Sequence, residues 1–291
     1  MSSVGPKDLL VLQLAASDPP GRLADWLSAA GLTLDVRDAE QPGAVPASLD
    51  AHAGLVVLGG DMGAGDDERA PFLPAVRALL REAVRAERPT LGVCLGAQLL
   101  AAANGGRVAR NPEGPEFGAQ LIAKRTAAAS DPLFGPIPIT PDVIQWHFDA
   151  VTTLPPGAIV LAGSPLCEVQ AFRLGRLAWG IQFHIETTPE IVRAWATADA
   201  VALDGYDVER ILQRADAADA DVAEVWLPFV TAFAGVVLNP GDVRATRTVP
   251  TSSAEPITDP AAIRAALAAE MTASRQPAAL PMPGRRPPTD G

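Results

Sequence analysis

The stretch Leu-Gly-Val-Cys-Leu-Gly-Ala-Gln, residues 91–98, decides the fold. An apolar run that predicts a buried strand, 90–94, ends in Cys94, and a helical pattern, 95–103, begins at the next residue. Gly92 and Gly96 stand two positions before and two positions after the cysteine. This spacing is typical of a nucleophile elbow with Cys in place of Ser, in which side chains at the glycine positions would collide with neighbouring backbone.

The elbow also gives Cys94 a chemical setting. The turn lifts the sulfur above the edge of the sheet and places it at a helix N-terminus, where the helix dipole favours the thiolate. The amide of Leu95 would point at an oxyanion formed near the sulfur. Taken alone, the motif also fits a buried structural cysteine beside a tight strand–helix turn.

Strands and helices alternate on both sides of the elbow. Besides those of the elbow, the patterns predict strands at 8–14, 32–36 and 54–58 and helices at 20–30 and 74–86. This alternation predicts an α/β fold with an open, mostly parallel, flavodoxin-like sheet and helices on both of its faces. Short strands at 119–124, 143–146, 160–162, 169–173 and 177–182 and a helix at 189–200 complete an expected domain of residues 1–200.

The residues after 200 have a different pattern. Helical stretches at 207–213 and 223–237 carry three large aromatic residues that need a surface to pack on: Trp226, Phe229 and Phe233. We therefore expect a helical appendage over 201–238. The last segment, 239–291, contains no aromatic residue and is rich in proline, a composition typical of a disordered tail.

Composition excludes several classes of partner. The net charge is −11 and the chain has no basic cluster beyond Arg285-Arg286, so it lacks the basic face that nucleic-acid binding by charge requires. No apolar run approaches the ~18 residues that span a bilayer, and the N-terminus does not resemble a signal peptide. The two cysteines, Cys94 and Cys167, form neither a disulfide framework nor a zinc motif. We expect no membrane partner and a cytoplasmic location.

A second motif supplies a base. In the stretch 179–186, Trp-Gly-Ile-Gln-Phe-His-Ile-Glu, His184 and Glu186 follow a predicted strand at positions i and i+2, so that both side chains leave the same face. A carboxylate on the far ring nitrogen holds a catalytic imidazole in one tautomer. By itself the motif also fits a partly exposed loop histidine.

The two motifs are predicted to meet. Cys94 and His184 both follow predicted strands, and the carboxyl ends of parallel strands form the functional edge of such a sheet. Gly59-Gly60 follows another strand at the same edge, where glycine lets backbone amides approach a ligand. Gly60 is therefore a candidate second oxyanion donor. Outside these motifs, His52 is expected to be solvated and Cys167 to be an inert buried thiol.

Together these pieces resemble the class I glutamine amidotransferases of the cysteine-triad type, and among them the stand-alone proteins similar to the amidotransferase domain of GMP synthase. The resemblance covers roughly residues 8–198. The matching pieces are Leu58-Gly59-Gly60, the elbow 92–98, Gln145-Trp146-His147-Phe148-Asp149 and Gln182-Phe183-His184-Ile185-Glu186.

The resemblance implies a role for each matching residue. Cys94 would attack the side-chain amide of glutamine, with His184 as the base and Glu186 as its orienting partner. The amides of Gly60 and Leu95 would form the oxyanion hole. Gln98 would contact glutamine, and Trp146, His147 and Phe148 would line its pocket, with His147 in a structural rather than a proton-transfer role. No organic cofactor and no metal is required by this chemistry.

Three departures from the family pattern surround these residues. Asp61 stands where a proline is usual after the two glycines, Ile185 stands where a proline separates the histidine and the glutamate, and Phe148 stands where a small residue is usual. None of them removes a catalytic atom. Asp61 and Phe148 are expected to alter the loops around the pocket and with them the compound that is bound.

Three functions remain open from the sequence. The chain would release ammonia from glutamine through a γ-glutamyl thioester, to water or to a separate synthetase, since no synthetase motif follows the domain. It would alternatively be a free-standing hydrolase of γ-glutamyl peptides or amines. The third function is that of a catalytically silent regulatory protein on the same fold, which the intact set of Cys94, His184 and Glu186 disfavours.

Overall fold

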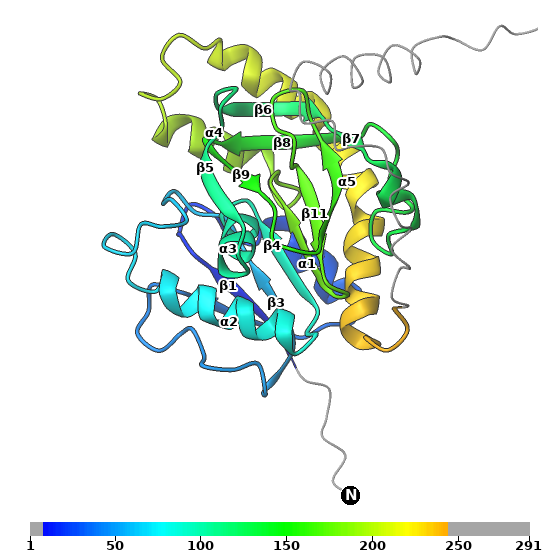
Figure 1. Cartoon of the computed structure of the whole chain (residues 1–291). Helices are drawn as coiled ribbons and strands as arrows, with labels where there is room; N and C mark the ends of the chain where they lie inside the picture. The colour runs from blue at the N-terminus through cyan, green and yellow to red at the C-terminus, as the bar shows by residue number, and fades with distance from the viewer. Residues whose placement is uncertain (1–7, 244–291) are drawn as a thin grey trace, which may run out of the picture. The chain divides into compact units, whose positions relative to one another are not determined.

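A mixed eight-stranded sheet forms the centre of the molecule (Figure 1). The structure, a computed structural model, describes residues 8–243. The strand order is β2-β1-β3-β4-β12-β11-β10-β7, and the first five strands run parallel while the last three pair antiparallel. The parallel strands are β1 (Asp8–Gln13), β2 (Leu34–Asp38), β3 (His52–Val57), β4 (Thr90–Val93) and β12 (Ala178–Ile181). The antiparallel strands are β7 (Ala123–Lys124), β10 (Ala158–Gly163) and β11 (Ala171–Leu174).

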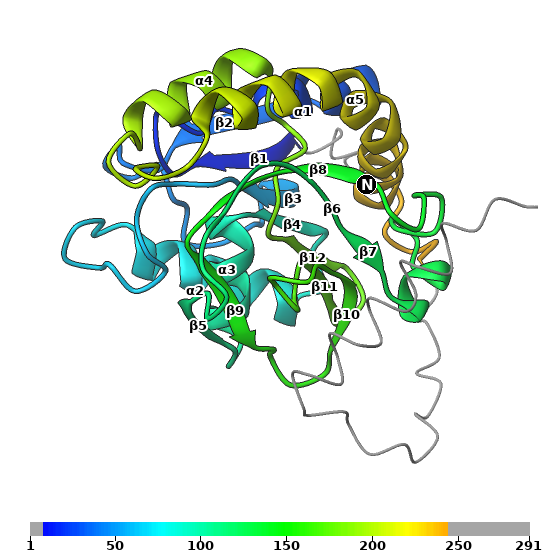
Figure 2. The same cartoon turned by 90° about the horizontal axis from the view of Figure 1, so that it is seen from above.

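Helices cover both faces of this sheet, as the sequence predicts (Figure 2). On one face lie α1 (Gly21–Ala29), α4 (Pro189–Ala198) and α5 (Val208–Leu238). On the other face lie α2 (Leu73–Arg85) and α3 (Leu95–Ala103), and a short 3₁₀ helix, η1, spans Thr126–Ser130. The predicted mostly parallel sheet between two helical layers is thus confirmed.

Two small antiparallel ribbons extend the structure beside the central sheet. They pair β5 (Arg107–Arg110) with β9 (Asp149–Thr153) and β6 (Glu116–Leu121) with β8 (Asp142–His147). A single bridge joins β8 to the segment after β12: His184 N–H donates to the carbonyl of Ile144 at 2.8 Å, and Ile144 N–H donates back at 3.2 Å. This bridge brings the residues at the end of β8 to the carboxyl edge of the parallel strands.

The two helices predicted over 207–213 and 223–237 form one continuous helix, α5, of 31 residues with Pro228 in its interior. An internal proline removes one hydrogen bond of the helix. Apolar residues continue at helical spacing on both sides of it, at Trp226, Phe229, Val230 and Phe233, and all four are fully buried. The helix therefore runs through Pro228, as the stretch predicted at 223–237 does, and it also runs through the predicted gap at 214–222, where Ala215 and Val222 are buried.

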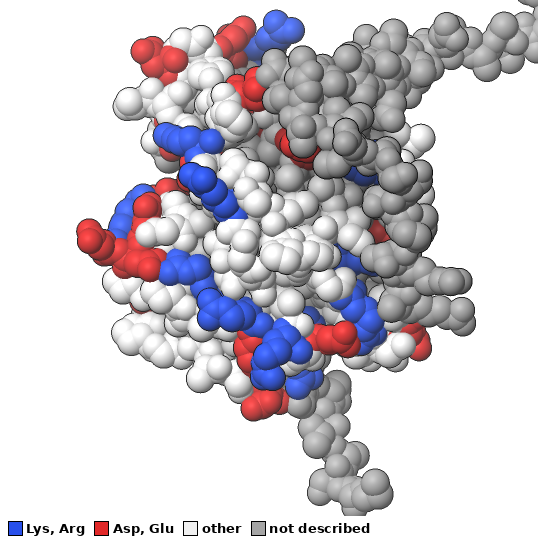
Figure 3. All heavy atoms as spheres, in the orientation of Figure 1, with Lys and Arg blue, Asp and Glu red and all other residues white. Residues whose placement is uncertain are grey.

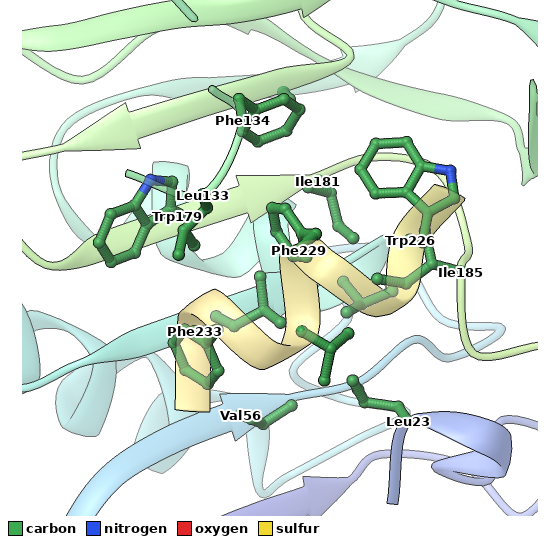
Figure 4. Packing of buried hydrophobic residues seen from close by; sticks show 14 of the residues in the cluster. Leu23, Val56, Leu133, Phe134, Trp179, Ile181, Ile185, Trp226, Phe229 and Phe233 are labelled. Atoms are coloured by element: carbon green, nitrogen blue, oxygen red, sulfur yellow. The ribbon is translucent and has the colours of Figure 1, made fainter. Parts of the chain in front are cut away.

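The aromatic stripe of α5 packs directly on the sheet (Figure 4). Phe229 lies edge-on to Phe134, with ring centroids 5.2 Å apart, and Trp226 lies 4.9 Å from Phe183. The indole N–H of Trp226 donates to the carbonyl of Asp142 at 2.9 Å. The segment predicted as a helical appendage therefore contributes to the same hydrophobic cluster as β1, β3 and β4. The predicted disordered tail lies outside the described residues except for 239–243.

Among residues 8–243, α5 is the one helix whose length and composition would suffice to cross a membrane, although no run of consecutive apolar residues predicts one. Its most apolar part includes Trp226, Phe229 and Phe233, which are in contact with the sheet. A helix buried in a protein core passes the same test, and the packing in Figure 4 is of that kind.

The packing of α5 leads to a test of stability. We expect Phe229→Ala to lower the free energy of unfolding by about 3–5 kcal/mol, because it leaves a cavity between α5 and the sheet. Leu227, two positions earlier on the same helix, is 42% exposed. Leu227→Ala should therefore change the value by no more than about 0.5 kcal/mol. Urea unfolding followed by circular dichroism measures both, and equal effects would contradict the packing described here.

Candidate active site

The predicted elbow is present as a sharp turn between β4 and α3. Cys94 connects them with a φ of +50°, a left-handed conformation that is strained for a side chain other than glycine. A Cβ atom on Gly96 would lie 2.0 Å from the carbonyl oxygen of Val57, and one on Gly92 would lie 2.6 Å from that of Gly96. Both glycines are therefore required by close backbone contacts, which is the reason that the sequence suggests for them.

Cys94, His184 and Glu186 lie together at the carboxyl edge of the sheet. His184 Nδ1 is 2.6 Å from Glu186 Oε1, and both side chains are almost fully buried. The other carboxylate oxygen of Glu186 accepts the backbone N–H of Ile185 at 2.9 Å, which fixes its orientation. Because Nδ1 of His184 faces Glu186, Nε2 is the ring nitrogen left to form the hydrogen bond with the side chain of Cys94.

The surroundings of His184 favour its charged form. Burial by itself lowers the pKa of the imidazole, but the charges of Glu186 and Cys94 and the hydrogen bonds to both raise it. The net effect is a pKa well above the usual value for histidine. An imidazolium between a carboxylate and a thiol sulfur stabilises the thiolate, the reactive form of cysteine.

A chain of side-chain amides also reaches the sulfur. Gln182 Nε2 lies 3.6 Å from Cys94 Sγ, and Gln98 Nε2 donates to Gln182 Oε1 at 3.1 Å and to the carbonyl of Asp149 at 3.0 Å. The sulfur also lies 3.9 Å from the carbonyl oxygen of Trp146. Gln182 is not among the site residues predicted from the sequence, although it lies inside the motif that contains His184.

These groups open into a cavity of about 760 Å³. The residues predicted for the site that line it are Gly60, Cys94, Leu95, Gln98, Trp146, His147, Phe148 and His184. Glu186 does not line it, since it lies behind the imidazole. Leu95 is the first residue of α3, so its N–H belongs to the helical turn that has no acceptor within the helix.

His147 is held by a buried carboxylate that the sequence does not reveal. Its Nε2 lies 3.0 Å from Glu116 Oε2, and its Nδ1 lies 3.0 Å from the carbonyl of Asp149. Glu116 is buried and also accepts hydrogen bonds from Ser164 and Gln170. With both ring nitrogens engaged by the protein, His147 is arranged to position the wall of the cavity.

Glu116, His147 and Cys167 have potential metal-ligand atoms within 4.8 Å of one another. The thiol of Cys167 is buried, and burial together with the charge of Glu116 raises its pKa to about 12. A thiol with this pKa keeps its proton, whereas a metal ligand must lose it. The hydrogen bonds that already engage Glu116 and His147 fit a structural polar cluster.

Asp18 and Trp195 are two further neighbours of His184, and neither is predicted from the sequence. The rings of Trp195 and His184 have centroids 4.6 Å apart, and the indole N–H donates to the carbonyl of Ser17 at 2.8 Å. Asp18 is buried and lines the cavity. The sequence does carry one signal for Asp18. It comes shortly after the first strand, so it lies at the same edge of the sheet as Cys94 and His184, which also follow strands.

One expectation about histidine is wrong. His52 is buried rather than solvated, and its Nε2 lies 2.8 Å from Asp35 Oδ2. It is the first residue of β3, which lies next to β1 inside the sheet. A hydrogen-bond partner from another strand thus replaces the water expected around it.

Two of the departures from the family pattern shape the mouth of the cavity. Asp61 is exposed and pairs with Arg69 on the loop between β3 and α2. Phe148 packs edge-on against Phe117, with centroids 5.4 Å apart, and the guanidinium of Arg110 lies 5.0 Å from the Phe148 ring. An aromatic ring and an ion pair thus stand where the usual pattern has a small residue and a proline.

Comparison with known proteins shows the family of this chain. The family model described as glutamine amidotransferase class-I matches residues 22–195. The glutamine amidotransferase-like protein YfeJ of Salmonella typhimurium is 33% identical over 59% of this chain and 72% of its own length. A subunit of the glutamine-hydrolyzing GMP synthase of Halobacterium salinarum is 35% identical over 54% of this chain and 76% of its length. Gamma-glutamyl peptidase 3 of Arabidopsis thaliana is 29% identical, over 50% of this chain and 58% of its own.

Solved structures share the fold over most of the chain. A glutamine amidotransferase from Thermotoga maritima superposes with a TM-score of 0.70 at 27% identity, covering 78% of this chain and 98% of that one. A glutamine amidotransferase from Methylobacillus flagellatus gives a TM-score of 0.71 at 29% identity, covering 83% and 97%.

The environments of the two cysteines predict different reactivities. At neutral pH we expect iodoacetamide to modify Cys94 and to leave Cys167 unmodified, as measured by mass spectrometry of tryptic peptides. Glu186→Gln should slow the modification of Cys94, because the imidazolium loses the carboxylate that helps to raise its pKa and so stabilises the thiolate less.

Glu190→Gln is the matched control, since this carboxylate is exposed at the start of α4. Its labelling rate should equal that of the wild type. An unchanged rate in Glu186→Gln would mean that another group stabilises the charged His184.

Proposed function

Because the chain belongs to the class-I glutamine amidotransferase family, we propose that it hydrolyses the side-chain amide of glutamine or of a related γ-glutamyl compound through a thioester on Cys94. The observation that carries this proposal is the buried arrangement of Cys94, His184 and Glu186, with the imidazole between the sulfur and the carboxylate. A cysteine, a base and an orienting acid are the components of nucleophilic catalysis at an amide.

The first half of the reaction forms the thioester. The proton of the Cys94 thiol passes to His184, and the thiolate attacks the amide carbon of the substrate. The backbone N–H groups of Gly60 and Leu95 stabilise the oxyanion of the tetrahedral intermediate. His184 then gives its proton to the nitrogen of the leaving group as the carbon–nitrogen bond breaks, and ammonia or an amine departs.

The second half regenerates the enzyme. A water molecule loses a proton to His184 and attacks the thioester carbon, and the carbon–sulfur bond breaks. Glutamate leaves, and the proton on His184 returns to the sulfur. Glu186 stabilises the imidazolium in both halves, and Gln182 donates to the sulfur at the moment when it carries charge.

Four residues of the cavity wall are proposed to hold the glutamyl part of the substrate. They are Gln98, Trp146, His147 and Phe148. Gln98 is held by Gln182 and by the carbonyl of Asp149, so its amide is oriented before the substrate arrives. His147 serves this wall through Glu116 and not as an acid or base.

The fate of the released nitrogen separates two functions. Relatives whose names are those of a GMP synthase subunit and an aminodeoxychorismate synthase favour delivery of ammonia to a separate synthetase. The size of the cavity favours direct hydrolysis of a γ-glutamyl compound larger than glutamine. Its volume of about 760 Å³ falls within the range of roughly 300–1,000 Å³ that holds drug-sized ligands. The two free cysteines, Cys94 and Cys167, fit a cytoplasmic site of action.

The proposal is tested by the release of ammonia from glutamine, followed with a coupled glutamate dehydrogenase assay. We expect Cys94→Ala to lower the rate by about 10⁴-fold or more, because no other group forms the thioester. Circular dichroism should show an intact fold.

Cys167→Ala is the matched control. This thiol is buried and holds its proton, so its removal should leave the rate within about threefold of the wild type. Retention of the full rate by Cys94→Ala would overturn the proposed mechanism.

A further inference from the structure

Asp18 is a buried carboxylate, and one of its two oxygens accepts a hydrogen bond within the protein. Its side chain follows β1, and the residue is 8% exposed. Asp18 Oδ2 accepts a hydrogen bond from the hydroxyl of the adjacent Ser17 at 2.5 Å. No Lys or Arg among residues 8–243 forms an ion pair with it, and burial raises its pKa, against the charge of His184 and the Ser17 hydroxyl, which lower it. A buried carboxylate is costly unless a cation or several donors satisfy it.

The free side of Asp18 faces the reacting atoms. A Cβ atom built on Gly59 would lie 2.6 Å from Asp18 Oδ1 and 3.3 Å from Cε1 of His184. The carboxylate and the imidazole therefore both pack against the backbone of Gly59, which places them beside each other. Both residues also line the cavity.

The part of the cavity beside His184 is where the departing nitrogen must lie. His184 must reach that nitrogen to protonate it, so the leaving group lies beside the imidazole. Three other residues line the cavity as well: Gln98 of α3, Phe148 between β8 and β9, and Asp149 at the start of β9. Asp18 comes from the loop between β1 and α1.

The same part of the cavity has an acidic rim. Figure 3 shows acidic side chains gathered over the loop between β3 and α2. Asp61 and Asp66 of this loop line the cavity. Asp61 is paired with Arg69, and Asp66 accepts the N–H of Gly63 at 2.7 Å. Among these carboxylates, Asp18 is the one that is buried and that forms no ion pair with a Lys or Arg of residues 8–243.

We infer that Asp18 binds a second, cationic nitrogen on the leaving group, so that the preferred substrate is a γ-glutamyl amide of a diamine or of another amine that carries an ammonium group. This inference rests on the proposed function and names its substrate class. The ammonium would form the ion pair that no Lys or Arg of residues 8–243 provides, in addition to the charge of His184. It would also use the part of the cavity that glutamine, with ten non-hydrogen atoms, does not need.

Two other roles for Asp18 predict different behaviour. A carboxylate that only supported the charge of His184 would accelerate every substrate alike, and Glu186 already holds Nδ1 of that imidazole. A carboxylate that bound the α-ammonium of the glutamyl group would act on every γ-glutamyl substrate alike. Only a leaving-group site discriminates between amines.

The test uses two amides of the same shape. γ-Glutamyl-4-aminobutylamide and γ-glutamyl-n-pentylamide differ only in an ammonium group that replaces a methyl group. We expect the wild type to hydrolyse the charged amide with a kcat/KM about ten- to a hundredfold higher, the range for a hydrogen bond to a charged partner. Asp18→Asn should bring the ratio of the two kcat/KM values close to one.

Asp66→Asn is the matched control. It removes the same charge from the same cavity at an exposed loop, and the ratio should stay at the wild-type value. A wild-type ratio near one would overturn the inference, and so would an Asp18→Asn enzyme that is slower on both amides but keeps the ratio. Glutamine hydrolysis in the same preparation reports on the proposed function separately.

Binding gives a second readout that does not depend on turnover. Calorimetry on Cys94→Ala should give a Kd for the charged amide that is at least about tenfold lower than for the neutral one. Cys94→Ala combined with Asp18→Asn should bind both amides equally. Equal affinities in Cys94→Ala itself would overturn the inference even if the wild type hydrolyses neither amide.

Discussion

The whole site depends on one close contact between backbones. Gly96, in the first turn of α3, lies against the carbonyl of Val57 at the end of β3, with no space for a Cβ atom between them. The contact sets the distance between the strand that carries Gly59 and Gly60 and the turn that carries Cys94. The strained φ of Cys94 is the local cost of this arrangement, and the packed strands on both sides maintain it.

The charged groups of the site are also held in defined positions around the turn that carries Cys94. The raised pKa of His184 comes from a carboxylate on one ring nitrogen and a thiol on the other, which outweigh the effect of burial. Glu186 is held in turn by the backbone of Ile185, and Gln182 links the sulfur to Gln98. Because each group is held by a hydrogen-bonded neighbour, the reactive atoms are oriented before the substrate binds.

The sequence predicts the parts of this molecule that obey short-range rules. The glycines of the elbow, the alternation of strands and helices and the His-x-Glu pair each depend on short stretches of chain, and their positions in the structure agree with the patterns. The misses come from contacts between distant residues. The gap predicted at 214–222 is helical, with Ala215 and Val222 buried there. His52 on β3 pairs with Asp35 on β2, across the strand β1 that lies between them. The roles of Asp18 and Glu116 cannot be read from the sequence, because they depend on the fold that places these residues beside His184 and His147.

The position of β12 in the sheet has a consequence for how the protein is made. Its residues 178–181 pair with 90–93 of β4, so a central strand of the sheet is the last strand along residues 8–243. Until it is inserted, β4 has an open edge and Cys94 has no base. Pairings between segments so far apart in sequence form slowly, since a long loop must close first. The pairing of Cys94 with His184 therefore forms only after residues 178–186 have been synthesised and β12 has been inserted beside β4.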